Sequence, residues 1–85
     1  MEREESLERI NKIFREVFDD NSLEIKESTS ASDIEDWDSL THITLISAVE
    51  DEFDVKFSMK DVLGMKNVGE MVDIIMEDLQ WFLLH

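Results

Sequence analysis

The sequence contains no cysteine and no proline among its 85 residues. Without cysteine, the chain can form no disulfide, no cysteine-based metal site and no thiolate nucleophile of its own. Without proline, its helices can continue uninterrupted. No segment approaches the roughly 18 apolar residues that a membrane span needs, and the first residues contain no apolar signal core. We therefore expect a cytoplasmic protein that does not insert into a membrane.

Basic residues are scarce as well. Lys and Arg number 8 against 22 Asp and Glu, so the formal net charge is -14. Such an acidic surface repels phosphate backbones and anionic lipid heads, which excludes nucleic acid and membrane surfaces as partners. The apolar residues still make up 42% of the chain, and they recur at regular spacing, as in a folded protein. We expect a single domain over residues 1–85, because this length allows no second core.

The first and last expected helices carry apolar residues at the three- and four-residue spacing of an amphipathic helix. The first follows Ser6, a candidate N-cap, and its apolar stripe covers residues 7–18. The last begins after the capping residue Asn67, and its stripe covers residues 68–83.

A central helix is expected between them. Asp38 or Ser39 caps it, Leu40 opens its buried stripe, and it ends near Phe53. Before this helix, residues 19–37 lose all periodicity and form a long loop. Its isolated apolar anchors on the core are Leu23, Ile25 and Ile34.

One short helix follows the central one. Ser58 and Asp61 have the spacing of a capping box, and Gly64 suits the left-handed position that stops a helix of one or two turns. The predicted fold is therefore all-α: a small bundle of three main helices plus one short helix, with a long loop between the first and second.

The residues offer little material for catalysis. Ser39 and His42 lie one helical turn apart, but nothing clearly orients the imidazole as a base, so we interpret His42 as a solvated residue of the helix surface. The acidic segment 33–38 does not match a calcium loop, because Asp38 occupies the position that requires glycine. We interpret the later acidic residues 50–54 as a solvated face, and we expect no metal site.

The most informative segment is Asp36-Trp37-Asp38-Ser39-Leu40, where the loop becomes the central helix. Ser39 can be a capping residue and nothing more. However, the segments Ile34–Leu40, Val49–Phe53 and Val68–Ile75 together resemble the acyl carrier protein family, which includes peptidyl carrier domains. The resemblance covers roughly Leu7 to Leu79.

The resemblance implies a cofactor and a site. A phosphopantetheinyl transferase moves 4′-phosphopantetheine from coenzyme A onto the motif serine, here Ser39, with Trp37, Asp38 and Leu40 as the surrounding motif. The carrier then holds acyl groups as thioesters. Loading enzymes and downstream synthases or transferases of fatty acid, lipid or polyketide biosynthesis are the implied partners, and we expect a monomer.

Partner enzymes of this family commonly dock on acidic residues of the second helix. This chain departs from that pattern, with Thr41, His42 and Thr44 near the serine, which favours dedicated partners. The charged docking candidates that remain are Glu50, Asp51, Glu52 and Asp61.

Some acyl carriers shelter the acyl chain between their helices. The residues that could line such a space here are Ile46, Val62, Met65, Met71 and Ile75. We favour core packing for these residues, because a small bundle must bury them. Residues 81–84 are apolar, and they either extend the core, associate with a second copy or meet a partner.

The sequence thus predicts an acyl carrier protein without catalytic activity of its own, carrying phosphopantetheine on Ser39. A peptidyl or aminoacyl carrier is the nearest alternative. An unmodified acidic helical interaction module, in which Ser39 is merely a cap, is an alternative of another class.

Overall fold

Four α-helices and a short 3-10 helix make up the computed structural model, which describes the backbone of residues 2–84 and the side chains of residues 2–79. The described residues contain no strand, which confirms the predicted all-α bundle. The elements in chain order are α1 (Arg3–Val17), η1 (Ala31–Asp33), α2 (Ser39–Phe53), α3 (Met59–Gly64) and α4 (Val68–Leu84). None of these helices, over the residues described, is long and apolar enough to cross a membrane.

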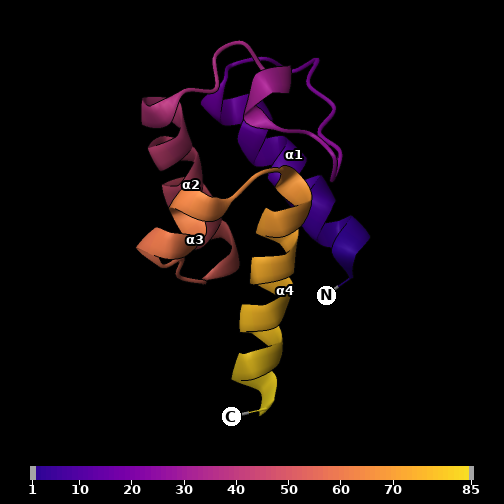
Figure 1. The fold of residues 1–85 in the computed structure, drawn as a ribbon. Coiled ribbons are helices and arrows are strands. Elements are labelled where there is room, and N and C mark those ends of the chain that lie inside the picture. The colour runs from indigo at the N-terminus through magenta and orange to yellow at the C-terminus, as the bar shows by residue number, and fades with distance from the viewer. Residues whose placement is uncertain (1, 85) are drawn as a thin grey trace.

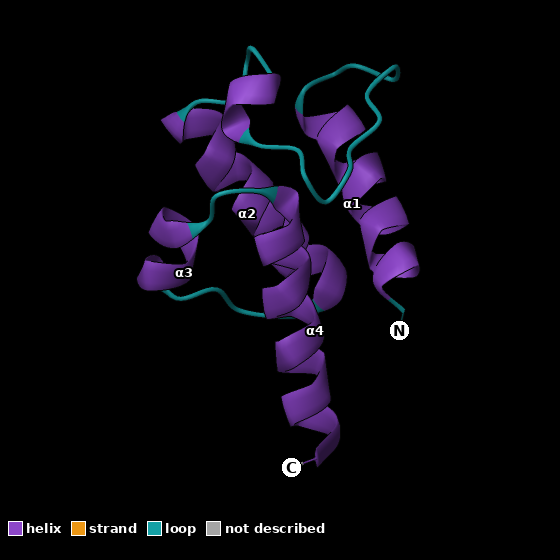
Figure 2. Cartoon of the chain, turned by 45° about the vertical axis from the view of Figure 1, so that its right-hand side comes forward, coloured by secondary structure: helices purple, strands orange, loops and turns teal. Residues whose placement is uncertain are grey.

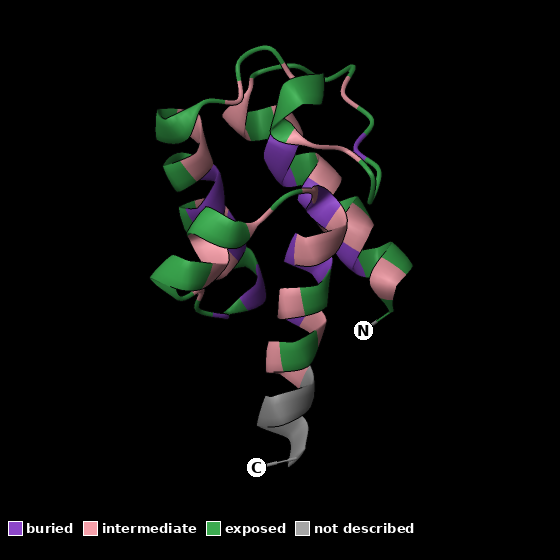
Figure 3. Ribbon diagram, in the orientation of Figure 1, coloured by how far each residue is buried: buried purple, intermediate pink, exposed green. Residues whose placement is uncertain are grey.

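The core lies where α1 packs against both α2 and α4 (Figure 1). Buried faces of all three helices point inward there, whereas α3 stands at the edge of the bundle with loops at both ends (Figures 2 and 3). The fully buried apolar residues confirm the stripe predicted for the first helix and, over residues 68–79, the stripe predicted for the last. They are Ile10 and Phe14 on α1 and Val68, Met71, Val72 and Ile75 on α4, and Leu45 and Val49 of α2 lie among them.

Ser6 does not cap α1, contrary to the sequence prediction. The helix begins at Arg3, with Glu2 in the cap position, and Ser6 lies fully buried within it. The Ser6 hydroxyl donates to the sulfur of Met76 on α4 at 3.6 Å. The serine therefore serves helix packing, which a local capping rule cannot anticipate.

Leu40 does not open a buried stripe on α2, which is the second correction. Leu40 is 77% exposed and Ile43 is 56% exposed. The buried face of α2 consists of Leu45, Ile46, Val49 and Phe53. At about 100° per residue, Leu40 and Ile43 lie on the opposite side of the helix from the spine formed by positions 45, 49 and 53.

Gly64 does not adopt the left-handed conformation predicted for it. It is the last residue of α3, and neither glycine of the chain has a positive φ. Within the described backbone, the left-handed residues are Asp19 and Asp54, with φ of 51° and 53°. Asp54 is the C-cap of α2. Aspartate can take this role because it tolerates the left-handed conformation better than most residues with a side chain.

The long loop is attached to α1 by specific hydrogen bonds. The side chain of Asn11 accepts from the N–H of Ile25 at 2.6 Å and donates to its carbonyl at 3.1 Å. Arg15 donates to the carbonyl of Leu23 at 2.8 Å. Ile25 is buried, as predicted for an anchor. The loop also contains η1, which the sequence analysis does not predict. Ser30 and Asp33 form a capping box at its start.

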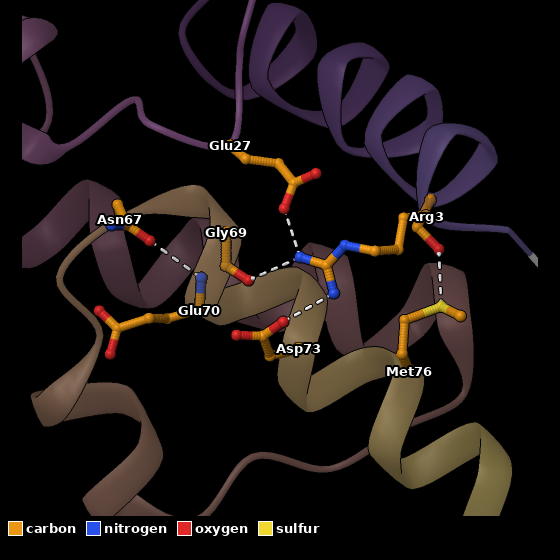
Figure 4. A network of polar contacts seen from close by, with 8 residues as sticks. Arg3, Glu27, Asn67, Gly69, Glu70, Asp73 and Met76 are labelled. Carbon is orange, nitrogen blue, oxygen red and sulfur yellow. Dashed lines mark hydrogen bonds and ion pairs between the residues drawn. The ribbon is translucent and has the colours of Figure 1, made fainter.

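The same loop caps α4. The N–H groups of Val68 and Gly69 donate to the carbonyls of Thr29 and Glu27 at 2.9 and 2.7 Å. These donors belong to the first turn of α4, where no carbonyl of the helix itself can accept them. Asn67 accepts from the N–H of Glu70 at 2.9 Å, which confirms it as a capping residue (Figure 4).

Arg3 joins the three segments that meet at this end of the bundle. Its guanidinium pairs with Glu27 of the loop, donates to Asp73 of α4 at 2.6 Å and reaches the carbonyl of Gly69 at 3.5 Å (Figure 4). The hydrogen bonds to Glu27 and Asp73 raise the pKa of Arg3 above its ordinary value. This network ties α1, the loop and α4 together.

Candidate functional site

The start of α2 is fixed by Asp38. Its carboxylate accepts from the N–H of Thr41 at 3.0 Å, and the hydroxyl of Thr41 accepts from the N–H of Asp38 at 2.8 Å, so the two residues form a capping box. The Thr41 hydroxyl also donates to the carbonyl of Asp36 at 2.9 Å. The hydrogen bonds from Thr41 lower the pKa of Asp38, which stays ionised at neutral pH. The predicted cap is confirmed, and Asp38 is the residue that makes it.

Ser39 is the first residue of α2, and it is exposed. Because Asp38 makes the cap, the side chain of Ser39 is not needed for that purpose. The hydroxyl stands where the positive end of the helix dipole favours negative charge. This position allows an enzyme to reach the oxygen and allows the helix to hold a phosphate attached to it.

His42 is not a solvated surface residue, contrary to the sequence interpretation. It is half-buried, and its Nδ1 accepts from the indole N–H of Trp37 at 3.0 Å. Its Nε2 lies 3.1 Å from the carbonyl oxygen of Val62 on α3. Both ring nitrogens thus have partners other than Ser39, which excludes His42 as a base for that serine in this arrangement.

A cavity of about 380 Å³ opens beside Ser39, between the start of α2 and α3. Apolar and polar side chains both contribute to its wall. The lining residues are Ala31, Trp37, Asp38, Ser39, His42, Val62, Leu63, Met65, Lys66 and Asn67. A volume of this size, at the low end for small-molecule sites, can receive part of a group tethered to the serine.

The structure separates the five residues considered for an acyl pocket. Val62 and Met65 line the cavity beside Ser39. Ile46, Met71 and Ile75 lie in the core with exposed fractions of 5%, 0% and 0%. The favoured interpretation of these three as core residues agrees with their burial.

The docking candidates also differ in their surroundings. Thr44, Asp51 and Glu52 are exposed on α2; the Thr44 hydroxyl donates to the carbonyl of Leu40 at 3.3 Å, and Glu52 pairs with Arg9 at 3.5 Å. Two others are less exposed: Thr41 in the cap of α2, and Glu50, whose carboxylate accepts from the N–H of Phe57 at 2.9 Å. Asp61 belongs to the capping box that Ser58 forms at the start of α3, as the sequence predicted.

Two further expectations concern other parts of the chain. The apolar side chains of residues 81–84 lie outside the described side chains. Within the described residues, no group of three or more His, Asp or Glu side chains is placed to hold a metal ion.

Comparisons with known proteins were made for the whole chain. The family described as "Phosphopantetheine attachment site" matches residues 8–75, from α1 into α4. A search of curated proteins gave no match. Among solved structures, the chain is similar to the holo acyl carrier protein from Geobacter metallireducens, determined by solution NMR. The identity is 40%, the match covers 94% of this chain and 92% of that chain, and the TM-score is 0.86.

Proposed function

Because this chain belongs to the phosphopantetheine-attachment family of carrier proteins, with covalently attached 4′-phosphopantetheine as cofactor, we propose that it is a discrete acyl carrier protein. In this proposal the cofactor is attached to Ser39. The protein has no catalytic activity of its own, works in the cytoplasm, and delivers acyl thioesters to enzymes of fatty acid, lipid or polyketide biosynthesis.

The exposed position of Ser39 at the start of α2 carries the proposal. The side chain of Asp38 caps the helix, so the neighbouring hydroxyl remains available for modification. The open cavity beside Ser39 provides room for the part of the arm nearest the attachment point. The site therefore fits a phosphodiester-linked group.

Attachment joins Ser39 Oγ to the phosphorus that bears the pantetheine, and the bond from that phosphorus to the adenosine bisphosphate of coenzyme A breaks. The hydroxyl proton leaves to a base of the transferase. At the start of α2, the helix dipole stabilises the charge of the resulting phosphodiester. When attached, the cofactor supplies the thiol that the chain lacks, and acyl groups bind to it as thioesters.

Partner enzymes are proposed to dock on the exposed side of α2. Leu40, Ile43, Thr44 and Asp51 recur there at helical spacing, and all four are exposed. Two of these four residues are aliphatic and one is a carboxylate, a composition that favours partners recognising shape and apolar contact as well as charge. This supports dedicated enzymes rather than the general fatty-acid machinery.

The test is to incubate the protein with coenzyme A and a broad-specificity phosphopantetheinyl transferase and then to weigh it intact. The parent is expected to gain the mass of one phosphopantetheine, and Ser39→Ala none. Ser47→Ala is the matched control, because Ser47 is also an exposed serine of α2. If several transferases leave the parent unchanged, the chain is an unmodified interaction module. Loading by an amino-acid-activating enzyme in preference to acyl-loading enzymes would make it a peptidyl carrier.

A further inference from the structure

His42 lies between Ser39 and the interior of the bundle. Ser39, His42 and Ile46 follow one another at spacings of three and four residues, so they share one side of α2. Along this side exposure falls from Ser39, which is exposed, through the half-buried His42 to the buried Ile46. A group that is tethered to Ser39 and runs along this side toward the core meets the imidazole first.

The imidazole of His42 is held at both nitrogens. Because the indole N–H of Trp37 donates to Nδ1, the proton lies on Nε2, which donates to the carbonyl of Val62. The rings of Trp37 and His42 also stack, with their centroids 5.9 Å apart. The imidazole cannot turn aside without losing two hydrogen bonds and this stacking contact.

The carbonyl of Val62 depends on His42 in turn. Val62 lies near the end of the six-residue α3, where the last carbonyls have no donor four residues later in the helix. The N–H of Lys66, four residues on, donates instead to the carboxylate of Glu70 at 2.8 Å. No residue of α3 is fully buried, and Val62 packs against the core only in part, so this bond from α2 adds to the attachment of the short helix.

The cavity beside Ser39 lies on the outer side of this bridge. Its wall includes Ser39, His42 and Val62, whereas the buried residues Ile46, Met71 and Ile75 do not contribute to it. Lys66 and Asn67 give the wall polar groups beside the apolar Leu63 and Met65. The space open to the tethered group is therefore a small surface cavity of mixed polarity, separate from the apolar core.

We propose that His42 is a specificity-determining residue, which closes the route from Ser39 into the core and so restricts sheltered cargo to short or polar acyl groups. This inference rests on the proposed attachment at Ser39. A short acyl group lies in the surface cavity, and a long saturated chain remains outside the bundle, because entry requires the bond between His42 and Val62 to break.

The test compares thioesters of increasing length, from acetyl through butyryl and octanoyl to palmitoyl. For each variant, the melting temperature of the holo form is subtracted from that of each acyl form, which removes any direct effect of the substitution. The wild-type difference is expected to stay constant beyond butyryl. In His42→Ala, the difference is expected to rise by several degrees toward palmitoyl, because the route is open.

Two variants separate this role from simple packing. In His42→Gln, the side-chain amide can accept from Trp37 and donate to Val62, so the constant wild-type series is expected to return. Ser47→Ala, on the exposed side of the same helix, is expected to behave as the wild type. If Gln behaves as Ala does, the hydrogen-bonded bridge is not the barrier, and the proposal fails.

The proposal is overturned if the wild-type melting-temperature difference rises with acyl-chain length as steeply as that of His42→Ala. The intact mass of the holo form tests the attachment separately, so absence of the mass gain overturns the proposed function instead. If His42→Ala does not fold, Trp37→Phe removes the indole donor and keeps an aromatic ring. Without that donor the imidazole is free to turn away from Val62, so the melting-temperature difference is expected to rise with acyl length more than in the wild type. An unchanged dependence on acyl length contradicts the bridge.

Discussion

The two sides of the molecule use their apolar residues in opposite ways. Where α1, the loop and α4 meet, aliphatic and aromatic side chains are buried, and Arg3 links the three segments. At the start of α2 and on α3, large apolar side chains face the solvent. They are Leu40, Ile43, Met59 and Leu63, with exposed fractions of 56–77%.

This difference shows how a small bundle can provide stability and an accessible site at once. The first side, the scaffold, holds the fold through burial that no partner needs to disturb. The second side, the site, exposes apolar surface and has a cavity beside Ser39, which we propose to serve cargo and partners. We expect substitutions on the scaffold to change stability and substitutions on the site to change recognition.

Phe14→Ala is expected to break the scaffold most severely. Phe14 is fully buried, and its ring lies 5.2 Å from Trp37 and 5.8 Å from Phe18, centroid to centroid. Removing such a ring costs about 3–5 kcal/mol. In a domain of this size the melting temperature should fall by at least about 12 °C. Thermal unfolding followed by circular dichroism measures this, and a shift no larger than that of Leu63→Ala would contradict the comparison.

Arg3→Gln is expected to weaken the scaffold moderately. The side chain of Arg3 is 40% exposed, so solvent screens its pairs with Glu27 and Asp73, and we expect a loss below about 1 kcal/mol. High salt should remove most of the difference from the wild type, because screened charges no longer contribute. Lys12→Gln, an exposed substitution on the same helix, is the control. A difference that persists in high salt would mean that packing of the side chain dominates.

Asp38→Ala is expected to loosen the start of α2 and so to lower the melting temperature at neutral pH. The hydrogen bonds from Thr41 keep the pKa of Asp38 below its ordinary value of 3.8. The stabilisation by the charged form is therefore present above this value and is lost as the pH falls through the lower pKa of the folded state. The difference in melting temperature between the wild type and Asp38→Ala should therefore become smaller below pH 3.8. A difference that becomes larger as the pH falls would contradict stabilisation by the ionised form of Asp38.

Ile43→Ala sharpens the comparison with the smallest effect on stability. Ile43 is 56% exposed, so its truncation is expected to change the free energy of unfolding by less than about 0.5 kcal/mol. Ile46→Ala, one turn further along α2, removes the same side chain from the core and should cost about 2–5 kcal/mol. Urea unfolding measures the free energy of unfolding of both variants. Equal losses of this free energy would show that the two sides of α2 are packed alike and would contradict the comparison.

Local patterns predicted most of the fold. The sequence predicts the stripes of α1 and α4, the caps at Asp38, Ser58 and Asn67 and the buried loop anchor Ile25, because each depends on residues a few positions apart. The predicted N-cap at Ser6 and the predicted left-handed conformation of Gly64 are wrong. Ser6 is held by packing against Met76, and α3 ends without a left-handed residue.

The sequence predicts only part of the site. Its motif singles out Ser39, which stays a proposal, but the two hydrogen bonds of His42 join residues up to 20 positions apart and depend on where α3 lies. The prediction that Leu40 opens the buried stripe of α2 is wrong for a related reason, since it rests on hydrophobicity alone. Hydrophobicity does not distinguish a residue kept for the core from one kept for a partner.

The stacking of Trp37 on His42 places a natural fluorophore at the contact that secures α3. Indole emission depends on the polarity and hydrogen bonding around the ring, so this carrier contains an optical reporter next to the proposed attachment site. With the second tryptophan changed to phenylalanine, the light from Trp37 alone would follow arrival of cargo in real time, with no dye attached.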